Sequence, residues 1–167
     1  AEGLNLIPYG TEDDLYVNGR ITGNSPYLTF EWKAGKDGKS YQVQTQLIGE
    51  YNFPNALAAI TIGRFFGVED AKINEALAGY TPQNNRSQLK KTDDNTLIID
   101  AYNANPTSMM AALQNFRNME VPHKMLILGD MRELGAESAA EHQKIADYLE
   151  ECAFEKVWLV GDQFAAA

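Results

Sequence analysis

Two amide side chains could recognise a nucleotide at the start of an expected helix. Asn52 and Asn55 are three residues apart, so they lie on one side of its first turn. A carboxamide offers a donor and an acceptor, which suits the edge of an adenine base or a ribose hydroxyl. Asn52 acting only as a helix N-cap, with Asn55 solvated, would explain the same pair structurally.

A second group of polar and aromatic side chains crowds one short loop that follows an apolar run. The group comprises Asp100, Tyr102, Asn103 and Asn105. Parallel sheets bind ligands at the carboxyl ends of their strands, and a carboxylate there could accept hydrogen bonds from ribose hydroxyls. Asn105 before Pro106 also fits an ordinary capped helix start, so both interpretations stand.

Arg86 lies in a polar segment that we expect to link two domains. A guanidinium group on such a linker can bind phosphate through two hydrogen bonds when the domains close, although a solvated arginine is the alternative. The loop 129–135 follows another expected strand, so its charged residues either face a ligand or only solvate the loop.

The segment Gly35–Ser40 ends in Gly-Lys-Ser, as phosphate-binding loops do, but it departs from their pattern. Lys33 occupies the position of the first required glycine, and the segment joins two alternating patterns rather than a strand and a helix. It is therefore predicted to be a hairpin turn.

Composition sets the remaining limits. The 167 residues, 44% of them hydrophobic, allow one ordinary domain or two small ones with folded cores. A net charge of −9 argues against nucleic acid as a partner. One cysteine excludes an internal disulfide or a cysteine-based zinc site. No apolar run approaches the roughly 18 residues of a membrane helix. His123 and His142 lack carboxylates at ligand spacing, so no metal site is predicted.

Residues 1–82 are expected to form a small antiparallel sheet with two helices. Strands are predicted over 4–9, 27–32 and 41–47, with a hairpin turn at Asn18-Gly19. Helices are predicted from Asn52 to about Gly67, with Phe65 facing inward, and over 70–78.

Residues 83–167 show a β-α-β-α-β pattern after the polar segment 81–85, where we expect a domain boundary. Apolar strands over 96–99, 125–128 and 157–160 alternate with helices over 106–119 and 138–152, the latter opening with a capping box at Ser138. This order predicts a parallel, Rossmann-like α/β sheet.

Four segments together resemble the Mur ligase family. Gly49–Ala59 resembles its Gly-x-His-Asn-x-x-Asn-x-x-Ala-Ala motif, with Tyr51 where many members have His. Asn85-Arg86-Ser87 resembles its Gly-Arg-Met element, with Asn85 where many have Gly. Residues 100–109 and 129–138 resemble the signatures of the member that adds D-alanyl-D-alanine to UDP-N-acetylmuramoyl-tripeptide.

The resemblance implies an ATP-dependent ligase of cytoplasmic peptidoglycan precursor synthesis, which serves cell-wall biogenesis, cell shape and cell division. ATP would phosphorylate a carboxylate, and an amine would attack the acyl phosphate. Asn52 and Asn55 would lie beside the adenosine, and Arg86 would bind the ATP phosphates as the catalytic cation. Asp100 would hold the ribose, with the other polar side chains of its loop, Tyr102, Asn103 and Asn105, lining the closed cleft.

The family's phosphate loop and magnesium ligands would lie before residue 1, and its late Lys-Gly-Ser-Arg segment after residue 167. The chain is therefore expected to be a fragment, inactive alone, with ATP and Mg²⁺ as cofactors of the whole protein. Residues 1–82 would end a central ATPase domain, and residues 83–167 would be most of a Rossmann-like C-terminal domain. The alternatives are a ligase of the folylpolyglutamate synthase type and a non-catalytic nucleotide-binding module.

Overall fold

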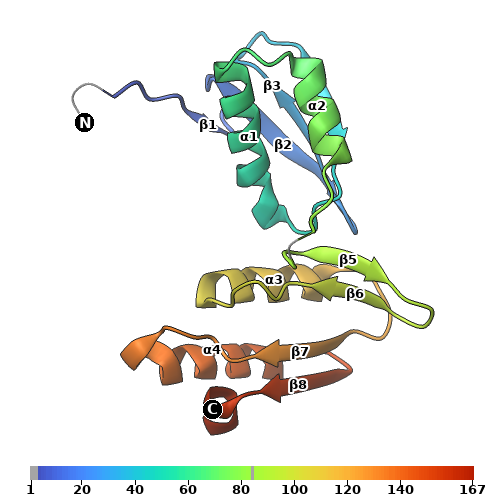
Figure 1. Ribbon diagram of the computed structural model, residues 1–167, viewed down its shortest axis with the longest axis vertical. Coiled ribbons are helices and arrows are strands. Elements are labelled where there is room, and N and C mark those ends of the chain that lie inside the picture. The colour runs from blue at the N-terminus through green and yellow to red at the C-terminus, as the bar shows by residue number, and fades with distance from the viewer. Residues whose placement is uncertain (1–3, 84) are drawn as a thin grey trace. The chain divides into compact units, whose positions relative to one another are not determined.

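The computed structural model describes residues 4–83 and 85–167, and the chain forms two compact units that divide between Ile99 and Asp100 (Figure 1). The first unit contains a sheet in the order β1-β2-β3-β4. Its strands are β1 (Tyr9–Gly10), β2 (Val17–Asn24), β3 (Leu28–Lys33) and β4 (Ser40–Gln44). β2, β3 and β4 pair antiparallel, which confirms the predicted small antiparallel sheet and the hairpin turn between Lys33 and Ser40.

The start of this sheet differs from the prediction. The strand expected over 4–9 is reduced to β1, which pairs parallel with β2. The turn predicted at Asn18-Gly19 is wrong, because both residues lie inside β2. A Cβ on Gly19 would lie 2.6 Å from the carbonyl oxygen of Glu31, so glycine here serves close strand packing. The buried amide of Asn18 donates to the carbonyls of Asp13 and Gly35.

Two helices cover one face of the sheet (Figure 1). A short 3₁₀ turn, η1 (Glu50–Asn52), leads into α1 (Phe53–Phe65), and α2 (Asp70–Gly79) follows. Apolar side chains that alternate along β3 pack against α1, and Phe65 is 53% exposed instead of facing inward. The core residues are Val17, Leu28, Phe30, Trp32, Val43, Phe53, Ala56, Leu57, Ile60 and Ile73.

A separate hairpin completes the first unit. β5 (Gln88–Lys91) and β6 (Thr96–Ile99) pair antiparallel, and Thr92 and Asn95 exchange hydrogen bonds across the turn. The strand predicted over 96–99 is therefore present as β6. It pairs antiparallel with β5, whereas a parallel neighbour was predicted. β5 has no counterpart among the strands predicted from the sequence.

The compact units divide later in the chain than the expected domain boundary at residues 82–83. The hydroxyl of Tyr51 hydrogen-bonds with that of Ser87, which ties the segment after Pro82 to the first unit. The domain assignment of 1–82 and 83–167 stays a prediction.

The second unit has the predicted parallel α/β pattern. β7 (Met125–Gly129) and β8 (Lys156–Val160) pair parallel, from Met125 opposite Lys156 to Gly129 opposite Val160. The helices are α3 (Pro106–Asn118), α4 (Ser138–Glu150), which follows the 3₁₀ turn η2 (Gly135–Glu137), and α5 (Asp162–Ala166). Its core comprises Leu113, Met131, Ile145, Leu149 and Phe164. The mixed α/β fold class is confirmed.

The predicted N-cap of α3 is confirmed, and the predicted capping box of α4 is wrong. The side chain of Asn105 accepts a hydrogen bond from the backbone N–H of Ser108 at 2.9 Å, so Asn105 is the N-cap of α3. Ser138 is the first residue of α4 and not its cap. The predicted capping box is wrong because the Ser138 hydroxyl donates to Gln163 instead.

No helix in the described part of the chain is long and apolar enough to cross a membrane.

Candidate functional site

A cavity of about 570 Å³ in the first unit brings together three of the predicted site residues, Asn52, Asn55 and Arg86. Its walls come from α1, α2 and the segment that follows α2. Most of its lining is apolar, with the polar groups few in number, as is typical of small-molecule sites. The apolar lining residues are Leu47, Ala56, Ala59, Gly63, Val68, Ile73, Ala76, Leu77 and Pro82.

Small residues on α1 make room for this cavity. Ala56, Ala59 and Gly63 recur at helical spacing, so they face the same side of α1. A Cβ on Gly63 would lie 3.1 Å from a side-chain carbon of Ile73, which shows how closely α2 approaches at that end. The result is an apolar floor on which a flat ring could lie.

The amides of Asn52 and Asn55 form a pair on the first turn of α1. Asn52 donates from Nδ2 to the carbonyl of Ile48 at 2.9 Å, and its Oδ1 accepts from Asn55 Nδ2 at 3.4 Å. Asn52 occupies the N-cap position of α1 without a side-chain capping bond, because its amide donates to the carbonyl of Ile48 instead. The pair orients the amide of Asn55, which is exposed.

Arg86 reaches this cavity from a constrained backbone segment. Its neighbours Asn85 and Ser87 both have positive φ, at 56° and 46°. Ser87 is buried, and its Oγ lies 2.5 Å from the Tyr51 hydroxyl. Arg86 itself is exposed and lines the cavity.

Lys72 is a lining residue that the sequence analysis missed. It lies on the first turns of α2, and its ammonium group is 3.6 Å from the carboxylate of Glu69. No motif marks this position; only the packing of α2 against α1 brings Lys72 to the cavity.

The second predicted group lies in the second unit, in the segment between Ile99 and α3. Asn105 caps α3, as the structural interpretation proposed. Tyr102 is 62% exposed, and Asp100 and Asn103 are also exposed. Their position before a helix N-terminus agrees with the sequence analysis, and their ligand-binding role stays a prediction.

The loop after β7 is held by a buried network. His142 is fully buried; its Nε2 accepts from the backbone N–H of Met131 at 3.0 Å, and its Nδ1 lies 2.7 Å from the carbonyl of Ser138. Asp130 accepts from the backbone N–H groups of Gln163 and Phe164 at the start of α5. Both side chains therefore have structural roles.

The same contacts set the ionisation of Asp130. Partial burial acts to raise the pKa of Asp130, but the two backbone hydrogen bonds and the nearby His142 outweigh it, so the pKa lies below its ordinary value. The carboxylate form is therefore favoured at the α5 terminus.

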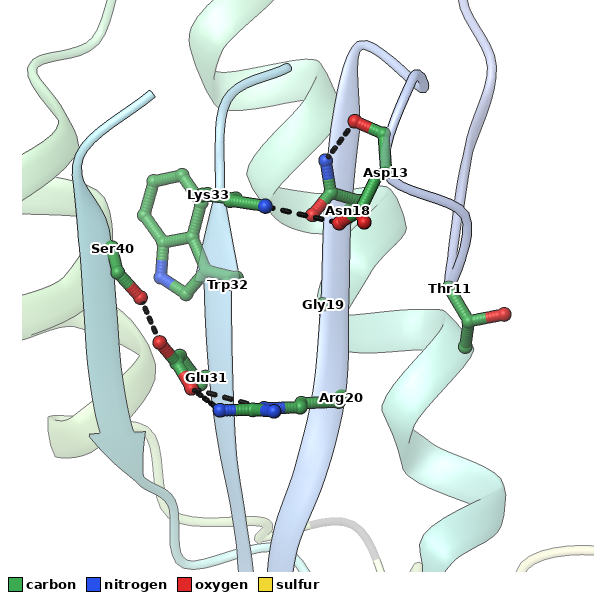
Figure 2. Close-up of a pocket in the computed structure, with 9 residues that line it drawn as sticks. All are labelled: Thr11, Asp13, Asn18, Gly19, Arg20, Glu31, Trp32, Lys33 and Ser40. Carbon is green, nitrogen blue, oxygen red and sulfur yellow. Dashed lines mark hydrogen bonds and ion pairs between the residues drawn. The ribbon is translucent and has the colours of Figure 1, made fainter. Parts of the chain in front are cut away.

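A second cavity, of about 400 Å³, lies over the face of the sheet opposite the helices (Figure 2). Arg20 pairs with Glu31, which Ser40 also contacts, and Lys33 pairs with Asp13 at 3.0 Å. The hydrogen bond from Ser40, followed by that from Arg20, lowers the pKa of Glu31, and Lys33 lowers the pKa of Asp13. The charged groups thus satisfy one another, and no predicted site residue lies there.

Among residues 4–83 and 85–167, no three histidine, cysteine, aspartate or glutamate side chains converge as metal ligands would.

The second half of the chain matches a known protein family. Residues 85–167 match the family model described as Mur ligase, glutamate ligase domain. The UDP-N-acetylmuramoyl-tripeptide–D-alanyl-D-alanine ligase of Bacillus subtilis is 38% identical over 117 residues, which are 69% of this chain and 26% of that protein. The ligase of the same name from Escherichia coli is 32% identical over 152 residues, 90% of this chain and 32% of that protein.

Solved structures agree with these relatives. A crystal structure of MurF from Acinetobacter baumannii superposes with a TM-score of 0.81 and 28% identity, covering 95% of this chain and 34% of that one. MurF ligase from Thermotoga maritima, solved in complex with ADP, has a TM-score of 0.75 at 18% identity, covering 95% of this chain and 36% of that one. The chain thus spans about a third or less of the curated relatives above, and it belongs to the Mur ligase family.

Proposed function

We propose that this chain supplies a nucleotide-binding part of an ATP-dependent ligase that adds D-alanyl-D-alanine to UDP-N-acetylmuramoyl-tripeptide. The cavity that joins Asn52, Asn55 and Arg86 is the main support, since these residues are at the family positions expected to hold ATP. The names of the relatives from B. subtilis and E. coli support the choice of substrates. Such a reaction belongs to cytoplasmic peptidoglycan precursor synthesis.

The cavity fits a nucleotide in chemical terms. An adenine ring would lie on the apolar floor, where it is shielded from water, and the amides of Asn52 and Asn55 would hydrogen-bond its edge or the ribose. Arg86 would bind the phosphates through charge-assisted hydrogen bonds. We also propose a ligand-binding role for the loop before α3, in which Asp100 accepts hydrogen bonds from ribose hydroxyls and Tyr102, Asn103 and Asn105 are further contacts.

In the proposed reaction, ATP phosphorylates the terminal carboxylate of the tripeptide and releases ADP. The amine of D-alanyl-D-alanine then attacks the acyl carbon, forms the amide bond and displaces phosphate. Positive charge stabilises the phosphoryl group as it is transferred, and Arg86 supplies one such charge. We expect most of the magnesium ligands to lie outside these 167 residues.

ATP binding by the chain tests the proposal. Isothermal titration should show binding to the unchanged chain, and Arg86→Ala should weaken it by about 10-fold or more, since a hydrogen bond to a charged group contributes roughly 1.5–3 kcal/mol. Asn55→Ala should weaken ATP and adenosine binding alike. Arg20→Ala, in the second cavity, is the control and should bind as the unchanged chain does. Absence of ATP binding by the unchanged chain would refute the proposal.

The chain alone should not ligate, because none of its segments matches the complete phosphate-loop pattern. We expect no amide product with ATP, Mg²⁺ and both substrates. In the full-length protein, D-alanyl-D-alanine should be accepted and glutamate rejected as the amine, which separates this function from that of a folylpolyglutamate synthase.

A further inference from the structure

The backbone around Arg86 adopts a conformation that its residues do not favour by themselves. Asn85 and Ser87 have φ values of 56° and 46°, in the left-handed region where a Cβ crowds the following carbonyl. Such a conformation persists only when surrounding contacts hold it in place. Two such residues on either side of one arginine indicate that its position is determined by another part of the unit.

Tyr51 provides one of these contacts. Its hydroxyl lies 2.5 Å from Ser87 Oγ, and Ser87 is only 5% exposed. A short hydrogen bond to a buried hydroxyl is well shielded from competing water. Tyr51 belongs to η1, directly before Asn52, so the same turn that places the amide pair also holds the Arg86 segment.

The ring of Tyr51 is itself oriented by Gly49. Gly49 has φ 93°, and a Cβ at this position would lie only 2.3 Å from the ring. The glycine therefore leaves the space that the ring occupies and allows its hydroxyl to reach Ser87.

We propose that Tyr51 is a positioning residue, which holds Arg86 at the Asn52–Asn55 cavity through its hydrogen bond to Ser87. The proposal rests on the nucleotide-binding function above. Tyr51 acts on the phosphate end of the ligand only, because its effect passes through Arg86, while Asn52 and Asn55 contact the adenosine. Removal of the hydroxyl should therefore change the ratio of ATP affinity to adenosine affinity, which a general loss of folding would not do.

Tyr51→Phe removes the hydroxyl and keeps the ring. We expect about 3- to 10-fold weaker ATP binding, adenosine binding within twofold of the unchanged chain, and an unaltered midpoint of thermal unfolding. Ser87→Ala should give the same result, and the double variant should lose no more than either single variant, because both changes break one bond. Tyr16→Phe is the matched control: it makes the same chemical change in the same unit, away from the cavity.

Unchanged ATP affinity in Tyr51→Phe would overturn the proposal, and so would equal losses for ATP and adenosine or additive losses in the double variant. Amide hydrogen exchange of residues 85–88 without nucleotide gives a second, independent measurement. Exchange should be faster in Tyr51→Phe than in the unchanged chain and the Tyr16→Phe control. If the unchanged chain binds no ATP, the proposed function fails, while unaltered exchange in Tyr51→Phe would still overturn the positioning role by itself.

Discussion

Because Gly161 has no Cβ, the loop after β7 can lie close to the start of α5. Gly161 has φ 124°, which residues with a Cβ rarely adopt. A Cβ here would also lie 2.2 Å from the carboxylate of Asp130. The glycine therefore allows Asp130 to reach the first N–H groups of α5.

Gly161→Ala should destabilise the second unit by about 1–3 kcal/mol from the backbone conformation alone, and more from the collision with Asp130. Gly129→Ala is the matched control, because no atom lies within 4 Å of its added Cβ. Urea denaturation of the two variants measures the free energy of unfolding of each. Equal losses in the two variants would contradict this account of Gly161.

At the scale of elements, α5 depends on a side chain from the end of another element. The helix has only five residues, too few to be stable alone. Asp130 accepts from Gln163 and Phe164 at 3.1 and 3.0 Å, and these bonds connect α5 to the end of β7.

Asp130→Asn should therefore weaken the second unit in a pH-dependent way. The pKa of Asp130 is lowered in the folded chain, so its carboxylate stabilises the fold fully above the ordinary value of 3.8. That contribution disappears as the pH falls below 3.8 through the folded-state pKa. The difference in unfolding free energy between Asp130→Asn and the unchanged chain should be largest near pH 7 and should shrink below about pH 3.8. A difference that does not vary with pH would contradict this account.

At the scale of the whole molecule, each compact unit has a hydrophobic core of its own. Leu57 and Ile145, each 1% exposed, belong to different cores. Trp32 and Trp158 also lie in different units, so their fluorescence can report each unit separately.

Leu57→Ala should destabilise the first unit by about 2–5 kcal/mol and leave the second unchanged, and Ile145→Ala should do the reverse. Calorimetry should resolve two unfolding transitions, of which each substitution lowers one. In a Trp158→Phe background, Trp32 is the only tryptophan. Its fluorescence then shows which transition belongs to the first unit. A single transition that both substitutions lower equally would contradict the separation.

Periodicity in the sequence was a good guide to elements and a poor guide to the contacts at their ends. The strands β3, β4, β7 and β8 and the four longer helices were predictable because burial imposes the apolar spacing. Asn18-Gly19 and Ser138 misled because long-range partners, Glu31 and Gln163, determine what those residues do.

The sequence by itself determined the longer helices, most of the strands, the parallel pairing of the last two strands and the segments that resemble the Mur ligases. These features depend on residue types at fixed spacing along one chain. Only the tertiary structure decided that Asn52, Asn55 and Arg86 share a cavity, that Lys72 lines it and that Tyr51 holds Ser87. These residues are far apart in the sequence. They come together because α1 packs against α2 and because Tyr51 hydrogen-bonds with Ser87.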